Sequence, residues 1–317
     1  MKSPHRLVSI AFLFIFSCDQ PSGNVTNIKA AAVTESRDTI FCMPGKNILG
    51  MQRTELTTGM KGMGKNGDLS TTVSGNELNM IVDGFKIIPL LELGSWAPFA
   101  LGADSAMIIG DIVVTENNLA SIQREVIAHG LKITDIHKYP SRDGAVIVFM
   151  HIIGSGNMTR LSTSAKAFFE TLKQAGVNTS KEKKAHSVIA NLNIALLDSI
   201  IGHKGEVAGD VYKYTIGRPD VLRAHGIPVS AFLEFNTWAA WQGTDETAVV
   251  AGDFTMLRDE VGPVIKALAE NDFEGVAVHN HLVHEEPGIF FLHYWGVGNA
   301  EKLAKGLKAA LNQQEKK

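Results

Sequence analysis

AMIIGDIVV at residues 106–114 and AVVAGDFTM at residues 248–256 are the two stretches that decide the fold. Each is short, apolar and rich in β-branched side chains, which is typical of a buried strand. They lie 142 positions apart, and the same shift superposes residues 67–156 on the second part of the chain without a gap. The aligned pairs include Gly110-Asp111 with Gly252-Asp253, His137 with His279, and His151 with His293. The body of the protein is therefore predicted to be two homologous halves.

Each half follows the order strand, helix, strand, strand, helix. Apolar residues at spacings of three, four and seven predict an amphipathic helix after each opening strand: Leu119, Ile122 and Val126 in the first half, and Val261, Val264, Ile265 and Leu268 in the second. Strand pairs are expected at 133–136 with 146–152 and at 275–282 with 289–295, and closing helices at 165–174 and 299–311. The sequence predicts an α+β fold of two β-α-β-β-α halves, with helices packed on an antiparallel or mixed sheet.

The chain divides into four parts. Gly, Asn, Ser and a Lys/Glu cluster interrupt the apolar periodicity between Gly176 and Lys184 and separate the two halves. We expect a signal peptide at 1–18, a polar tether at 19–45, the first repeat at 46–176 and the second repeat at 185–315.

Composition excludes several classes of protein. The chain has 317 residues, of which 45% are hydrophobic, so a disordered or collagen-like protein is excluded. Lys plus Arg number 30 against 33 Asp plus Glu, so no excess positive charge exists to follow a phosphate backbone, and nucleic acid is not an expected partner. Two cysteines, Cys18 and Cys42, are too few for an all-cysteine zinc site or a disulfide framework.

The N-terminus has the pattern of a secretory signal. Lys2, His5 and Arg6 precede a mostly apolar run from Leu7 to Phe16, which is too short to span a bilayer as a helix. The run ends at Ile15-Phe16-Ser17-Cys18, which resembles a lipobox and predicts lipidation of Cys18. The protein would then lie in the cell envelope, periplasmic or outward-facing, with the membrane as a partner through its lipid. An ordinary signal peptide cleaved nearby, or a Cys18–Cys42 disulfide, are the alternatives.

Four of the eleven histidines lie between residues 279 and 293. His279 and His281 project from the same side of a strand, and a turn at Glu285 to Gly288 would bring His293 close to His279 on that side. The predicted metal ligands are therefore His279, His281, Glu285 and His293. Nitrogen-rich ligation suits Zn, Cu, Ni or Fe rather than Ca or Mg, and Zn²⁺ is the leading candidate for the divalent transition metal.

The repeat also supports a purely structural interpretation of these histidines. His137 and His151 stand at the places of His279 and His293, whereas Tyr139 replaces His281 and Asp143 replaces Glu285. The first repeat would then carry a degenerate site, or the shared pair would be a hydrogen-bonded core pair common to both halves. Asp111 and Asp253 are interpreted as turn or bulge residues, or as acceptors that orient an imidazole.

The segments His279-Asn280-His281-Leu282-Val283-His284-Glu285-Glu286-Pro287 and Phe290-Phe291-Leu292-His293-Tyr294-Trp295 resemble the closing motif of the LppY/LpqO family of bacterial envelope proteins. The likeness covers roughly residues 50–315, although Gly288 stands where the family often has a basic residue. The resemblance implies an envelope-facing, often lipid-anchored protein with a duplicated domain. It implies no established activity.

Two functional hypotheses follow for this envelope-anchored lipoprotein. In the first, the second repeat carries a His/Glu pocket that binds a divalent transition metal; if the protein is an enzyme, a metal-polarised water with Glu285 or Glu286 as proton acceptor would give hydrolysis. In the alternative, the chain is a non-enzymatic module that binds a cell-envelope polymer or small ligand, and its histidines are structural. The sequence leaves open whether the protein is an enzyme.

Overall fold

The structure is a computed structural model of the whole chain. It describes residues 81–88, 94–101, 106–139, 146–174, 191–220, 235–283 and 285–314, with short pieces between 63 and 91 and between 222 and 229. The signal peptide, the tether, Cys18 and Cys42 lie outside the described residues.

The first half is an antiparallel sheet covered by two helices. Its centre is β8 (Ala106–Thr115), which pairs along its whole length with β10 (Ile147–Gly156), and β10 pairs in turn with the edge strand β9 (Lys132–Lys138). The helices are α2 (Glu116–Ala128) and α3 (Met158–Gln174). The remaining strands are β1 (Met63–Lys65), β2 (Asp68–Ser70), β3 (Thr72–Val73), β6 (Ser95–Trp96) and β7 (Phe99–Leu101).

The second half repeats this arrangement. Here β16 (Ala248–Leu257) pairs with β19 (Ile289–Gly298), and β19 pairs with the edge strand β17 (Glu274–His279). On the other side of β16 follow β15 (Asn236–Gly243), β12 (Val211–Gly217) and β11 (Glu206–Ala208). The helices are α4 (Ile194–Ile201), α5 (Val261–Ala269), which follows the short 3-10 helix η4 (Arg258–Glu260), and α6 (Ala300–Leu311).

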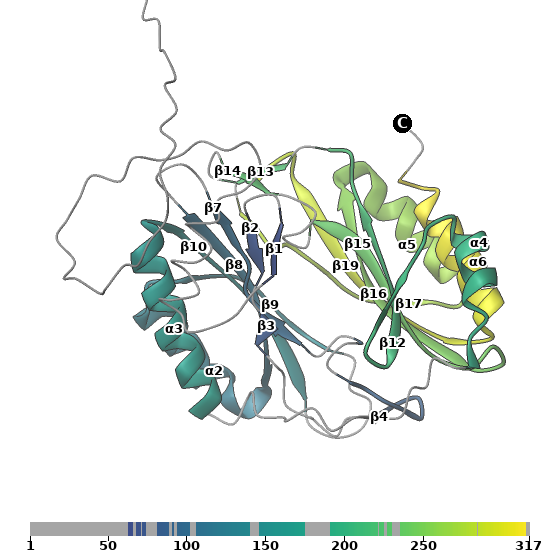
Figure 1. Cartoon of the computed structure of the whole chain (residues 1–317), viewed down its shortest axis with the longest axis horizontal. Helices are drawn as coiled ribbons and strands as arrows, with labels where there is room; N and C mark the ends of the chain where they lie inside the picture. The colour runs from purple at the N-terminus through teal and green to yellow at the C-terminus, as the bar shows by residue number, and fades with distance from the viewer. Residues whose placement is uncertain are drawn as a thin grey trace, which may run out of the picture. The chain divides into compact units, whose positions relative to one another are not determined.

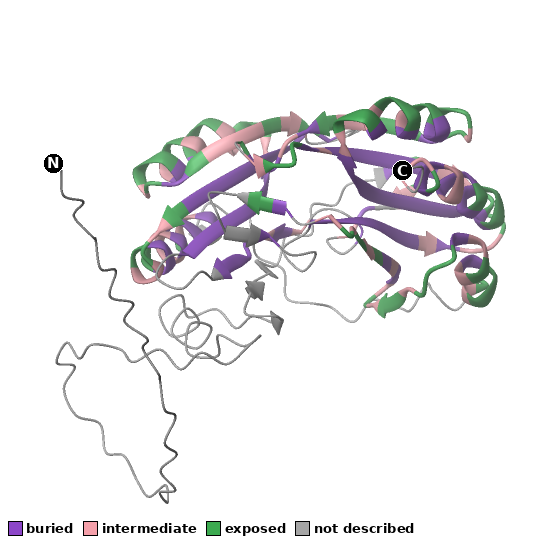
Figure 2. Cartoon of the chain, turned by 90° about the horizontal axis from the view of Figure 1, so that it is seen from above, coloured by how far each residue is buried: buried purple, intermediate pink, exposed green. Residues whose placement is uncertain are grey.

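The two sheets pack face to face, and the helices cover their outer faces (Figure 1). Successive side chains of β8 alternate between the two faces. Ile108 and Ile112 pack towards the helices with Phe168, whereas Val113 packs between the sheets in a cluster that includes Val249 of the other half. Figure 2 shows the resulting buried strands between partly exposed helices. Because both faces of each sheet are covered, the central strands are almost entirely apolar.

The α+β fold class and the two β-α-β-β-α halves are confirmed, and every strand pairing among the described residues is antiparallel. The prediction is wrong in one connection. Residues 285–288 do not form a simple hairpin turn, because β18 (Glu285–Glu286) pairs with β13 (Leu222–Ala224), which also pairs with β14 (Ile227–Val229). A separate hairpin joins β4 (Ile81–Val82) and β5 (Phe85–Lys86).

Candidate metal centre

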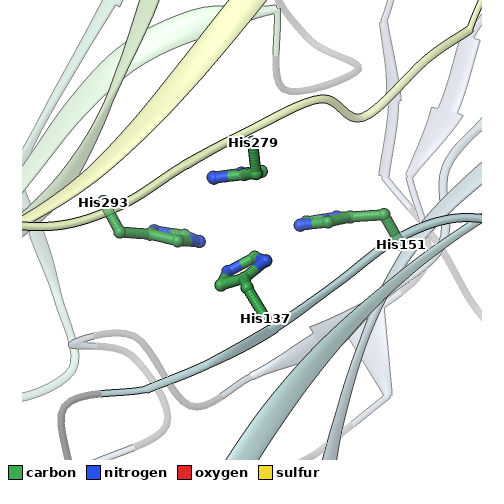
Figure 3. Close-up of side chains that lie close together, drawn as sticks. All are labelled: His137, His151, His279 and His293. Carbon is green, nitrogen blue, oxygen red and sulfur yellow. The ribbon is translucent and has the colours of Figure 1, made fainter.

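Four histidines, two from each half, meet between the sheets (Figure 3). His137 lies on β9 and His151 on β10, while His279 ends β17 and His293 lies on β19. The β-strand alternation that sends Val113 to the inner face also sends these side chains there. We call this set, His137, His151, His279 and His293, the four-histidine group.

The rings of the four-histidine group are close enough to share one ion. The ring centroid of His279 lies 4.4 Å from that of His137, 4.4 Å from that of His293 and 4.7 Å from that of His151. One ligand nitrogen from each residue lies within 4.8 Å of the others. Ligand atoms about 2.0–2.1 Å from a central ion stand a little over 3 Å apart, so small side-chain movements would complete a tetrahedral site.

A second group shares one of these histidines. Asp253 of β16, His279, and His281 in the loop after β17 also bring one ligand atom each within the same range. His279 Nε2 lies 3.0 Å from His281 Nε2, and Asp253 Oδ2 lies 3.9 and 3.8 Å from these two atoms. We call Asp253, His279 and His281 the Asp253 group. The described residues thus contain two largely buried groups, one of four histidines and one of two histidines and an aspartate, that could bind a metal.

Burial favours the neutral, ligating form of these imidazoles. Loss of hydration lowers the pKa of His151, His279 and His281 well below the ordinary value of 6.5. Repulsion between neighbouring histidines lowers these pKa values further. Three ring nitrogens have no hydrogen-bond partner among the described residues: Nδ1 and Nε2 of His151, and Nδ1 of His279. Because buried polar groups are normally paired, these nitrogens fit the role of metal ligands.

Carboxylates stand beside two of the histidines, one on the same strand and one on the neighbouring strand. Asp135 Oδ2 lies 2.6 Å from His137 Nδ1, and Asp111 Oδ1 lies 3.7 Å from His151 Nδ1. The first contact engages Nδ1 of His137, and such a contact is the usual way in which a carboxylate orients a metal-binding imidazole. Asp135 is therefore a positioning residue for His137. Asp111 and Asp253 were interpreted either as turn or bulge residues or as acceptors that orient an imidazole. Their placement beside imidazoles agrees with the second interpretation.

The predicted ligands are only partly brought together. His279 and His293 lie in the four-histidine group and His281 in the Asp253 group. His279 is paired with Phe291 rather than with His293, which is opposite Ala277, but the strand alternation keeps both imidazoles on one face. Glu285 accepts a hydrogen bond from the backbone N–H of Ile289 through Oε1, at 3.1 Å.

Glu285 and Glu286 belong to neither group of potential ligands within the part of the chain that the structure describes. Glu286 is exposed, and pairing of β18 with β13 carries both residues into a separate small sheet. Neither carboxylate therefore stands where the sequence placed it, next to a metal held by His279 and His293.

The sequence did not reveal that the first half contributes potential metal ligands. His137 and His151 were interpreted as a degenerate copy or as a core pair, whereas they complete the four-histidine group. The signal was present in the repeat, because equivalent positions of two homologous halves come together where the halves face each other. Asp253 is likewise opposite His293 in register, as Asp111 is opposite His151.

No described helix has both the length and the apolar character needed to cross a membrane.

Comparison with known proteins identifies the repeated unit. A search of curated proteins found no match. Among solved structures, the chain is similar to a trimeric bacterial microcompartment shell protein PduB, with 10% identity over 81% of this chain and 91% of that one and a TM-score of 0.21. A second similarity is to EtuB from Clostridium kluyveri, with 9% identity, 80% and 91% coverage and a TM-score of 0.18. These TM-scores are too low to support an argument about fold or function.

The family comparison covers both halves. A domain model described as Domain of Unknown Function (DUF1259) matches residues 52–171 and again residues 195–313. These segments agree with the two halves of the fold and with the 142-residue shift in the sequence. The chain therefore belongs to the DUF1259 family, whose domain it carries twice.

Proposed function

We propose that this protein binds a divalent transition metal, Zn²⁺ in the first place, at the four-histidine group. The observation that supports the proposal is the convergence of four imidazoles, two from each half and three of them buried, with one ligand nitrogen from each within 4.8 Å of the others. Neutral imidazole is a good ligand for Zn²⁺, and four nitrogen ligands suit its tetrahedral geometry. An ion held in this way would also join the two homologous halves.

Hydrolysis at the four-histidine group, with Glu285 or Glu286 as the base, has less support than metal binding. Four protein ligands complete a tetrahedral shell and leave no position for the water that hydrolysis requires. Glu285 is engaged with the backbone of Ile289, and the carboxylates beside the imidazoles are those of Asp111, Asp135 and Asp253.

We further propose that the protein is a lipid-anchored lipoprotein of the bacterial envelope, of the LppY/LpqO type, held to the membrane through Cys18. The basic and apolar segments before Cys18 and the lipobox-like Ile15-Phe16-Ser17-Cys18 support this proposal. Mass spectrometry of the protein from bacterial membranes tests it, because a Cys18→Ser variant would lose the lipid and leave the membrane fraction.

Metal analysis of signal-free protein tests the binding proposal. Protein dialysed against Zn²⁺ is expected to retain at least one equivalent per chain by elemental mass spectrometry. A His137→Ala/His151→Ala variant, which removes both first-half ligands, is expected to bind one ion fewer than the wild type. His203→Ala is the matched control, because His203 is exposed. If the double variant retained as much zinc as the wild type, the four-histidine group would not be the site.

Asp135→Asn is expected to weaken zinc binding by about 10- to 100-fold, the usual effect of removing a carboxylate that orients a metal-binding histidine. The amide cannot supply the negative charge that stabilises the orientation of His137, whose Nδ1 is 2.6 Å from the Asp135 carboxylate. Competition titration against a chromogenic zinc chelator measures the change. Unchanged zinc affinity would show that Asp135 does not orient a ligand, and Asp259→Asn, on the exposed surface, is the control.

A further inference from the structure

The Asp253 group has the dimensions of a metal site in its own right. Its three ligand atoms form a triangle with sides of 3.0, 3.8 and 3.9 Å. The circle through these atoms has a radius of about 2.1 Å, which is the length of a zinc–nitrogen bond. An ion near the centre of the triangle would therefore reach all three atoms without a large movement of any side chain.

The ligand set of the Asp253 group differs from that of the four-histidine group. Two imidazoles and one carboxylate are a common three-ligand set for zinc and iron sites that keep coordination positions open. The His281 ring is fixed from one side by Phe291, at a centroid distance of 3.8 Å and an interplanar angle of 9°. Asp253, His279 and His281 are all buried, so an ion there would be shielded from bulk water.

Only the second half carries this group. The equivalent positions in the first half are Asp111, His137 and Tyr139. Tyr139 is buried in the apolar cluster between the sheets, and His137 is engaged through Nδ1 with Asp135, whose own equivalent is Ala277. The two halves share a fold and an interface but differ at one ligand position, which is His281 in the second half and Tyr139 in the first.

We propose that Asp253, His279 and His281 form a second divalent-metal position, next to the four-histidine group and sharing His279 with it. Three protein ligands would leave at least one coordination position of such an ion for a water molecule. The sharing of His279 rests on the proposed function of the four-histidine group. The ligand set of the second position does not.

His279 can serve both positions as an imidazolate, because a neutral imidazole carries one N–H and release of that proton to solvent on binding of the second ion leaves both nitrogens as ligands. Its Nε2 belongs to the triangle with Asp253 and His281. Its Nδ1 is buried and has no hydrogen-bond partner among the described residues. Two ions per chain are therefore expected, and replacement of His279 is expected to weaken both.

Metal stoichiometry distinguishes the two positions. Protein equilibrated with Zn²⁺ and analysed by elemental mass spectrometry is expected to hold two equivalents in the wild type. His281→Tyr, which introduces the residue found at the equivalent place in the first half, is expected to hold one. His137→Ala/His151→Ala is also expected to hold one, and the combination of all three substitutions none. His203→Ala is the control with two equivalents.

Each failure has its own signature. One equivalent in the wild type that persists in His281→Tyr, or two equivalents in His281→Tyr, overturns the second position while leaving the four-histidine proposal intact. If instead the first-half double variant keeps two equivalents, the four-histidine group fails while the Asp253 group stands. If circular dichroism shows that His281→Tyr does not fold, Asp253→Asn replaces it, because the amide keeps the shape of the side chain and removes its charge. Asp253→Asn is expected to lower the zinc stoichiometry from two to one.

Discussion

Metal-free protein is expected to lose about 4 kcal/mol of its free energy of unfolding when the pH falls from 7.5 to 5.5. The pKa values of His151, His279 and His281 are lowered well below 6.5 in the folded protein by burial. The unfolded chain, whose histidines titrate near 6.5, therefore binds more protons than the folded one at pH 5.5. The stability that depends on these neutral histidines is fully present above pH 6.5, the unfolded pKa. It is lost as the pH falls from there towards the pKa values of the folded protein.

The size of the effect follows from the number of histidines. Each histidine that is neutral when folded and protonated when unfolded contributes somewhat more than ~1 kcal/mol at pH 5.5. Three of them account for the expected loss, which is a large fraction of a typical free energy of unfolding of about 5–15 kcal/mol.

Urea unfolding of chelated protein at the two pH values measures this loss. His281→Phe is the informative variant, because it removes one titrating ring next to Phe291 and is expected to reduce the pH effect by about a third. Zinc-loaded protein is expected to be more stable than chelated protein at both pH values, since the ion binds the folded state. An unfolding free energy independent of pH between 7.5 and 5.5 would mean that these imidazoles are not held neutral.

The local elements of the fold could be predicted from the sequence because their signals are local. The apolar stretch at 106–114 corresponds to β8, and the spacing of Ile122 and Val126 marks the buried face of α2. The repeat was equally visible, since it needs only comparison of the chain with itself. The helix α4 before the second sheet was not predicted, although Asn193 caps it by accepting from the backbone N–H of Leu196.

The packing of the two sheets could not be predicted in the same way. Nothing in the alternation of β10 says whether its second apolar face meets a helix, solvent or another sheet. Only face-to-face packing brings His137 and His151 to His279 and His293. For the same reason the sequence yielded three of the imidazoles and left the other two as a separate, degenerate site or a core pair.

Glu285 shows the converse error. A hairpin turn between two strands is the simplest local assumption, and it would have placed the carboxylate near His279. The chain between β17 and β19 instead pairs with β13, about sixty residues earlier in the sequence. A long-range pairing of two residues leaves no periodic pattern, so it could not be found from a single sequence.

Gly252→Ala is expected to destabilise the protein by about 3 kcal/mol, at the upper end of the range for an added methyl group in a packed core. Gly252 pairs with Ala239 on one side and with Tyr294 on the other. A Cβ atom at this position would overlap the backbone oxygen of Trp238 and the hydroxyl of Tyr294. These two atoms are joined by a hydrogen bond of 3.0 Å, so neither can move without disturbing the other.

Thermal or urea unfolding measures the loss, and Gly262→Ala is the matched control. Gly262 lies in α5 with open space around its Cα, so alanine there is expected to leave stability unchanged or raise it by up to about 1 kcal/mol. Because Asp253 follows Gly252 directly on β16, displacement of the strand is also expected to weaken metal binding at the Asp253 group. A Gly252→Ala protein as stable as the wild type would show that β15 and β19 can move apart at this point. The position of the Asp253 carboxylate near His279 and His281 would then not depend on close packing of the strands.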